Sequence, residues 1–253
     1  MFVRVVTRSS NIRCRRSLCA DSSTTYERRQ SDLIAALPDG RPARVCFTSE
    51  RGRHLVHDVA SGEECRRAAA IAMQTMSIYC DSDHDGSRLL PPHLPTALPL
   101  LGERGFALFA ALRDRVAERA RARYGAVEPS NSLISWISGA RDAGSVAEDR
   151  EATPTCFDLT RDPRHGTYAP HVDQANQRHY DVSALLYLTT AGVDFSGGGF
   201  AFNDADCDHR LIEPTAGLLL TFPSGFDNLH QVRPVRRGER VVLSVWFTRT
   251  SGE

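Results

Sequence analysis

The chain has 253 residues, of which 41% are hydrophobic and 25% charged, with equal numbers of basic and acidic side chains and a pI near 7.1. This balance is typical of a globular protein with a sizeable core, and the charge gives no reason to expect nucleic acid or an anionic membrane as a partner. The seven cysteines include no C-x-x-C pair, which argues against a zinc or dithiol motif and leaves their disulfide state open. No apolar run is long enough to predict a transmembrane helix.

The beginning of the chain differs in composition from the rest. Residues 1–40 are polar and rich in Arg and Ser, so we expect an irregular segment ahead of one domain at residues 41–253. The first twenty residues contain five Arg and no acidic residue, which is typical of an organelle transit peptide. A disordered basic tail explains the composition equally well, and the compartment stays open. Within residues 43–59, apolar and polar residues alternate in two short runs, which predicts one or two edge strands.

Helical support for the domain is expected at residues 61–125, in two helices. The first is predicted at 61–76, because Ser61 followed by Glu64 fits a capping box and an Ala-rich stretch comes after it. The segment at 81–99 is predicted to be a loop from its Asp, Gly and Pro content. It lacks the closing Glu of a calcium-binding loop, so we do not expect calcium there.

The second helix is predicted at residues 103–124. Phe106, Phe109 and Val116 recur there at mostly helical spacing, and Gly125 suits the C-terminal end. The Arg and Glu side of this helix would face water. Its apolar stripe therefore predicts packing against the outside of a sheet.

The composition of the sequence changes at Asn131, and the residues beyond it are predicted to form the core of the domain. Short β-branched and aromatic runs follow one another over residues 131–249, separated by turn residues at short intervals. Such a pattern is typical of a β-sandwich or barrel. We therefore predict a mainly β fold of two facing antiparallel sheets, with both helices outside one sheet.

Three side chains in this β region have the chemistry of a metal site. In an extended strand, residues two apart share a side, so His171 and Asp173 can address one ion. A third ligand must come from elsewhere, and His230 lies at the start of another strand. Two His and one carboxylate form the facial triad of non-haem Fe(II) oxygenases. Zinc hydrolases use the same ligands, but they also need a general base, and no obvious Glu accompanies either His.

An arginine favours the oxygenase over the hydrolase. Arg240 opens "RVVLSVWF", which is predicted to be a buried strand, and a buried guanidinium is costly without a carboxylate. A dicarboxylic cosubstrate that chelates iron at one end would place its other carboxylate there. Ser244 shares the strand face and can add a hydroxyl donor. Without a dicarboxylate we expect Arg240 to be poorly paired and to contact water.

These residues carry a resemblance to a known family. The stretch from Ser130 to Thr248 resembles the catalytic domain of prolyl-hydroxylase-like 2-oxoglutarate/Fe(II) dioxygenases, above all leprecan-type prolyl 3-hydroxylases and related oxygenase-domain proteins. The matching segments of the sequence are "HVD", "DVSALLYL", "DFSGGGFAF" and "IEPTAGLLLTFPSGFDNLHQVRPVRRGERVVLSVWF". The resemblance implies a double-stranded β-helix, or jelly roll. It also implies iron at His171, Asp173 and His230, with the 2-oxoglutarate carboxylate at Arg240 and Tyr187.

The resemblance further implies an activity. Fe(II), 2-oxoglutarate and O2 would hydroxylate an unactivated C–H bond and release succinate and CO2, with L-ascorbate as an auxiliary reductant. Asp173 indicates hydroxylation, because related halogenases lack a carboxylate at that position. The implied substrate is a prolyl or other residue in a peptide or protein; the alternative is a small molecule. The polar segment 139–167 is a candidate substrate lid.

Two readings from other functional classes remain open at this point. One is a jelly-roll binding module without turnover, although such a module would be marked by the loss of a triad residue. The other is the zinc-dependent hydrolase, which metal analysis and a succinate assay would distinguish from the oxygenase. The sequence leaves the oligomeric state open.

Overall fold

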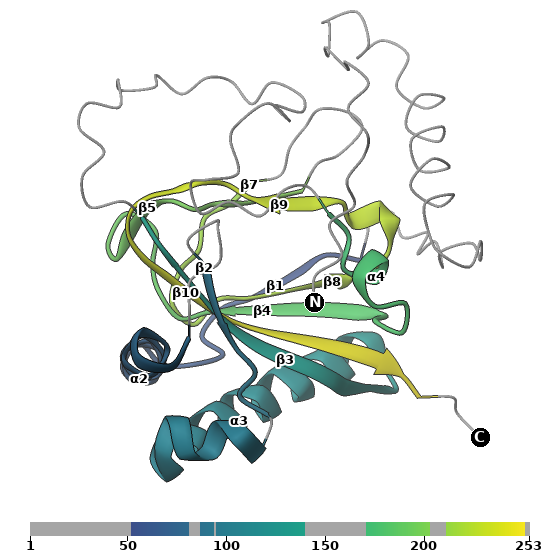
Figure 1. Ribbon diagram of the computed structural model, residues 1–253. Coiled ribbons are helices and arrows are strands. Elements are labelled where there is room, and N and C mark those ends of the chain that lie inside the picture. Colours follow the sequence, from purple (N-terminus) through teal and green to yellow (C-terminus); the bar gives the residue numbers. More distant parts are fainter. Residues whose placement is uncertain (1–51, 81–86, 94, 140–170, 203–210, 251–253) are drawn as a thin grey trace, which may run out of the picture.

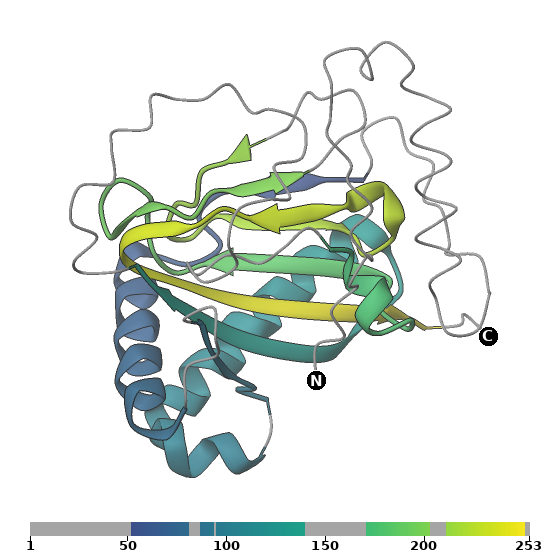
Figure 2. The same cartoon turned by 45° about the horizontal axis from the view of Figure 1, so that its top comes forward.

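Two layers of antiparallel strands lie one above the other, and two helices cover the outer face of the larger layer (Figure 1). The computed structural model describes residues 52–80, 87–93, 95–139, 171–202 and 211–250. Turning the molecule shows that α3 (Leu98–Tyr124) runs diagonally behind the larger sheet and that α2 (Gly62–Tyr79) stands at one end of its strands (Figure 2). The predicted mainly β fold with flanking helices is confirmed.

The larger sheet has the strand order β1-β8-β4-β10-β3-β2, and β5 pairs with the first part of β10. The smaller sheet has the order β7-β6-β9. In chain order the strands are β1 His54–Val56, β2 Ser87–Leu90, β3 Val127–Ser138, β4 Val182–Tyr187, β5 Phe195–Gly197, β6 Phe200–Phe202, β7 Leu211–Ile212, β8 Leu219–Pro223, β9 His230–Val232 and β10 Val235–Arg249.

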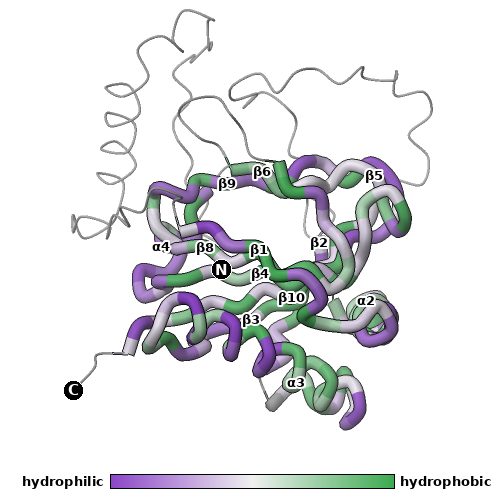
Figure 3. Tube along the Cα trace, turned by 180° about the vertical axis from the view of Figure 1, so that it is seen from behind, coloured by the Kyte–Doolittle hydropathy of each residue, from purple (hydrophilic) through white to green (hydrophobic). Residues whose placement is uncertain are grey.

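Strand β10 separates two hydrophobic cores, because its side chains alternate between the two faces of the sheet. Val241, Leu243 and Val245 are fully buried on the face that packs on the helices. Val242 faces the other way, into an aromatic-rich core between the two sheets. In Figure 3 the central strands are mostly hydrophobic, whereas hydrophilic residues recur along α3. The inner face of β10, which carries Arg240, therefore lines the space between the sheets.

Two helices close the outer face. Helix α2 spans Gly62–Tyr79 and begins with the predicted capping box between Ser61 and Glu64. Helix α3 spans Leu98–Tyr124, with a kink at Gly102, whose φ of 67° is unfavourable for other residues. The prediction of 103–124 matches the part beyond this kink. The first turn was missed because its Pro and three Leu residues carry no amphipathic period.

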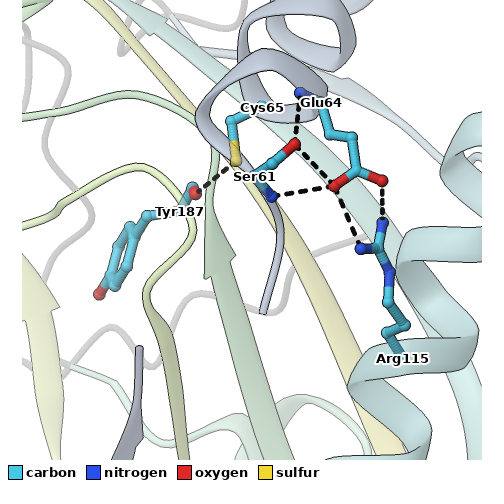
Figure 4. A network of polar contacts seen from close by, with 5 residues as sticks. All are labelled: Ser61, Glu64, Cys65, Arg115 and Tyr187. Carbon is cyan, nitrogen blue, oxygen red and sulfur yellow. Dashed lines mark hydrogen bonds and ion pairs between the residues drawn. The ribbon is translucent and has the colours of Figure 1, made fainter. Parts of the chain in front are cut away.

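The start of α2 also connects the helices to the barrel interior (Figure 4). Glu64 accepts two hydrogen bonds from Arg115 of α3, at 2.7 and 3.2 Å, and these bonds lower its pKa to about 2. The neighbouring thiol of Cys65 lies 4.0 Å from the backbone oxygen of Tyr187. That oxygen also accepts a hydrogen bond from the Gly217 amide. Helix α2 thus packs on the end of β4 that carries Tyr187.

One local prediction was wrong. Residues 87–90, predicted to belong to a loop, form β2, which pairs with β3 as the outermost strand of the larger sheet. Composition pointed to a loop because Asp, Gly and Pro surround this strand, whereas pairing with β3 and the stacking of Arg88 on Trp136 stabilise it. Of the one or two edge strands predicted within 43–59, β1 is present, while residues 43–51 and 1–40 lie outside the described residues. The domain boundaries at 41 and 253 remain predictions.

Within the described part of the chain, no helix has the length and apolar character needed to cross a membrane.

Candidate metal centre

Three potential metal ligands from two distant parts of the chain converge between the two sheets. One ligand atom each from His171, Asp173 and His230 lies within 4.8 Å of the others, the one such group of His, Cys, Asp and Glu found among the described residues. The Nε2 atom of His171 is 3.7 Å from Asp173 Oδ1, and that of His230 is 3.9 Å from Asp173 Oδ2. Ligands at right angles on one ion lie about 3 Å apart, so small side-chain rotations bring these atoms onto a common ion.

The backbone around the first two residues differs from the predicted strand. His171 forms an isolated bridge with His230, with hydrogen bonds of 2.9 and 3.0 Å in both directions. Asp173 then opens a short helix, α4, Asp173–Asn176. The two side chains therefore converge because the chain turns from a bridge into a helical turn, and not because they share one face of a strand. The bridge itself places His171 directly opposite His230.

Hydrogen bonds orient the carboxylate of Asp173. The Ser183 hydroxyl, on β4, donates to Asp173 Oδ2 at 2.6 Å, and Ser183 Oγ is 2.7 Å from Ser224 Oγ. The backbone oxygen of Ser224 also accepts the Gln174 amide at 3.0 Å, which fixes the start of α4. Asp173 is 6% exposed, and a buried carboxylate held in this way presents its oxygens in a fixed direction.

His230 is held in one tautomer. Its Nδ1 lies 2.8 Å from the backbone oxygen of Asn228, so Nδ1 carries the proton and Nε2 offers its lone pair. The rings of Phe200, Phe202 and Phe222 surround the imidazole, with Phe200 stacked at a centroid distance of 4.9 Å. This burial and the neighbouring His171 lower the pKa of His230 to about 4, against the opposing effect of Asp173. The neutral imidazole that a metal requires is therefore favoured near neutral pH.

Arg240 and Tyr187 meet at the other end of the same interior. The Arg240 guanidinium carbon lies 5.6 Å from the centre of the Tyr187 ring, and Nε donates to the Gly198 oxygen at 2.9 Å. Arg240 is 1% exposed, so the expectation that it contacts water is wrong: the side chain lies inside the β5–β10 region. A Cβ at Gly198 would approach Arg240 Cδ to 3.0 Å, which shows how closely the chain wraps this arginine.

The hydroxyl of Tyr187 is buried and has no hydrogen-bond partner among the described residues. Burial raises the pKa of this phenol, against the opposing effect of Arg240. A neutral O–H donor beside a guanidinium suits a carboxylate, which accepts hydrogen bonds from both. Ser244 is buried on the same face of β10 as Arg240, four residues closer to the His and Asp cluster, which matches the predicted placement.

The two ends are separated by a short stretch of β4. Ser183 bonds Asp173 at one end and Tyr187 lies beside Arg240 at the other, four residues or about 13 Å along the strand. This placement puts the His and Asp cluster and the guanidinium at opposite ends of one interior. The donor set, two imidazoles and one carboxylate, fits Fe(II) and leaves coordination positions for further ligands.

Sequence reasoning missed the residues that orient the cluster. Ser183, Ser224 and Asn228 are ordinary polar residues of strands and turns, and no spacing marks them. The sole available signal was the alternation of β4, which places Ser183 on the same side as Tyr187. Residues 140–167 of the predicted lid 139–167 lie outside the described residues.

Comparison with known proteins points to one family. Residues 157–248 match the model of the 2OG-Fe(II) oxygenase superfamily. The chain is 37% identical over 216 residues to human 2-oxoglutarate and iron-dependent oxygenase domain-containing protein 3, covering 80% of this chain and 64% of that protein. It is 40% identical over 219 residues to human prolyl 3-hydroxylase 2, covering 78% of this chain and 29% of that protein. The chain thus spans less than two-thirds of either relative.

The fold has a counterpart among solved structures. A prolyl hydroxylase from Trichoplax adhaerens, in complex with a hypoxia inducible factor peptide fragment, superposes with a TM-score of 0.56 at 16% identity. The alignment covers 89% of this chain and 91% of the other. This likeness supports the jelly-roll arrangement of the two sheets.

Proposed function

We propose that the chain is an Fe(II)- and 2-oxoglutarate-dependent dioxygenase that hydroxylates an unactivated C–H bond, because residues 157–248 match the 2OG-Fe(II) oxygenase superfamily. His171, Asp173 and His230 would hold the metal, and Arg240, Tyr187 and Ser244 would bind 2-oxoglutarate. One observation carries this proposal: the interior contains both a His-Asp-His cluster and a buried Arg–Tyr pair at its other end.

The residues of the chain have separate tasks in this proposal. When bound, Fe(II) and 2-oxoglutarate supply the oxidising chemistry, in which O2 is reduced while the keto acid becomes succinate and CO2. Asp173 and His230 are held by hydrogen bonds, so little reorganisation is needed when they bind an ion. Arg240 supplies a planar fork for a carboxylate, and Tyr187 donates a further hydrogen bond. The aromatic rings around His230 exclude water from that side of the site.

For the substrate we propose a prolyl or other residue within a peptide or protein. The support is the alignment with prolyl 3-hydroxylase 2, whose name specifies prolyl chemistry. A small-molecule substrate is the alternative. Asp173 favours hydroxylation over halogenation, because a carboxylate there occupies a position that halide would need. L-ascorbate as an auxiliary reductant belongs to the same proposal and would show as slower inactivation during turnover.

The proposal is tested by incubating the full chain with Fe(II), 2-oxoglutarate, O2 and a panel of peptides and metabolites. We expect succinate formation together with a gain of one oxygen in the mass of the hydroxylated substrate. His230→Ala should abolish both, because it removes a ligand of the metal. Wild-type succinate production by His230→Ala would show that iron catalysis through this cluster is wrong. Hydrolysis supported by Zn(II) without succinate would instead support the hydrolase.

A further inference from the structure

A charged residue outside the proposed active site contacts the turn that precedes one of the proposed ligands. Arg53 precedes β1, and its side chain reaches the connection between β8 and β9. Its Nε donates to Asn228 Oδ1 at 2.8 Å, and its Nη2 donates to the Asp227 backbone oxygen at 3.3 Å. Its guanidinium carbon lies 3.6 Å from the centre of the Phe202 ring. Arg53 therefore holds two neighbouring residues of one turn while it packs on an aromatic face.

Asn228 passes this contact on to His230. Both polar atoms of its side-chain amide form hydrogen bonds: Oδ1 accepts one from Arg53, and Nδ2 donates one to the Pro223 oxygen at 3.0 Å. The residue is 1% exposed and belongs to the 3-10 turn Phe226–Asn228. The backbone oxygen of the same residue accepts the Nδ1 proton of His230. The position of that oxygen determines the ring orientation and the tautomer of the proposed ligand.

Phe202 provides a second route between the same two residues. Its ring stacks under Arg53 on one side and lies among the aromatic groups that surround His230, 6.3 Å from the imidazole centre. Phe202 also pairs with His230 in the register of β6 and β9. Arg53 thus contacts both the turn before His230 and the strand opposite it.

We infer that Arg53 is a positioning residue for the proposed metal centre, acting through Asn228 and Phe202 to fix the Nε2 atom of His230. The inference rests on the proposed function and extends it to Arg53. This residue lies 177 positions before His230 and outside the residues 157–248 that match the family. The planar fork matters more than the charge, because two separate acceptors and a ring face are engaged at once. An ammonium group can reach one of these acceptors but cannot reproduce the stacked geometry.

The test measures Co(II) affinity and its absorption spectrum in the full chain, without turnover. In Arg53→Ala we expect affinity to fall about 10–100-fold, the range for residues that orient metal-bound histidines. Arg53→Lys should recover a small part of this loss. Arg121→Ala is the matched control, because Arg121 forms a bidentate pair with Glu128 on the surface, and it should leave affinity unchanged.

A double-mutant cycle separates positioning from a general effect on stability. In an Asn228→Ala background the Arg53→Lys change should have much less effect than in the wild type, because the main route to His230 is already broken. If Arg53→Ala does not fold, Arg53→Lys decides the question. Wild-type Co(II) affinity in folded Arg53→Lys, or equal effects of Arg53→Lys in both backgrounds, would overturn the inference.

Failure of the proposed function looks different. If wild-type protein and His230→Ala bind Co(II) equally, the proposed metal site itself is wrong. If the wild type binds Co(II) through His230 and the Arg53 variants bind as tightly, only the role of Arg53 is wrong.

Discussion

The two ends of the barrel interior are built differently. At the His-Asp-His end, Asp173 accepts a hydrogen bond from Ser183, and His230 Nδ1 donates one to the Asn228 oxygen. At the Arg240 end, the buried Tyr187 hydroxyl has no hydrogen-bond partner among the described residues. At the first end the protein alone orients the side chains. The second end retains the Tyr187 hydroxyl, to which a ligand can supply the missing hydrogen-bond partner. This contrast is expected if an ion binds first and a dicarboxylate completes the site.

The contrast has an energetic meaning. A buried hydroxyl without a partner costs about 1–3 kcal/mol, because its hydrogen bond to water in the unfolded chain is not replaced. A metal ligand that is held in place lowers the cost of reorganisation when the ion binds. Substitutions at the two ends should therefore differ in whether they change stability, metal affinity or cosubstrate affinity.

The largest effect is expected at Arg240. A bound dicarboxylate would receive two charge-assisted hydrogen bonds from it, each worth about 1.5–3 kcal/mol. Arg240→Ala should raise the apparent KM for 2-oxoglutarate about 100-fold or more and change Fe(II) affinity little. Arg240→Lys should recover only part of the loss, because an ammonium lacks the planar fork. Titrating 2-oxoglutarate against the decarboxylation rate measures this, and equal KM values in the three proteins would make Arg240 a structural residue.

Ser183→Ala should show the opposite pattern. It removes the hydrogen bond to Asp173 Oδ2 at the metal end, so we expect Co(II) or Fe(II) affinity to fall about 10-fold while the KM for 2-oxoglutarate at saturating metal stays near the wild-type value. Metal titration at fixed cosubstrate, followed by cosubstrate titration at saturating metal, separates the two. A rise in KM with unchanged metal affinity would mean that the two ends are not independent.

Tyr187→Phe is the sharpest test of the buried hydroxyl. The ring keeps its packing, while a group without a described partner is removed, so the free energy of unfolding without ligand should stay unchanged or rise by up to about 1 kcal/mol. The affinity for 2-oxoglutarate should fall several-fold. Urea denaturation and cosubstrate titration of the same samples give both quantities. A clear loss of stability in the absence of ligand would show that the hydroxyl has a partner within the folded protein.

The smallest effect is expected outside the barrel, at Glu64. Glu64→Gln removes a partly exposed ion pair with Arg115, and the free energy of unfolding should fall by about 0.5 kcal/mol with no change at either end of the site. The pKa of Glu64 is lowered from 4.5 to about 2, so its contribution is present above pH 4.5 and is lost as the pH falls toward 2. The difference between the two proteins should therefore shrink in acid. A constant difference down to pH 2 would contradict this cause.

The sequence predicted the residues with distinctive chemistry better than the residues that support them. His171, Asp173, His230 and Arg240 could be named because their types and order match a known pattern, and the resemblance to the family added Tyr187. The capping box predicted the start of α2 because Ser61 and Glu64 act locally. Local signals of this kind can be read from neighbours in the chain.

Contacts between distant segments could not be predicted in the same way. Arg53 reaches Asn228 across 175 positions, and nothing in either stretch marks the pair. Strand β2 depends on pairing with β3, which outweighs the loop-like composition around it. The water contact expected for Arg240 was wrong because β5 and Gly198 enclose its side chain, an arrangement that the sequence around Arg240 does not reveal.

The central claim is that one ion and one dicarboxylate connect the two ends of the interior. The most direct measurement is a crystal structure of the full chain with Mn(II) and 2-oxoglutarate, using anomalous scattering to locate the metal. We predict one ion about 2.0–2.2 Å from His171 Nε2, His230 Nε2 and an Asp173 oxygen. The distal carboxylate should bond Arg240 and the Tyr187 hydroxyl. An ion bound elsewhere, or a 2-oxoglutarate that does not contact Arg240, would contradict the account.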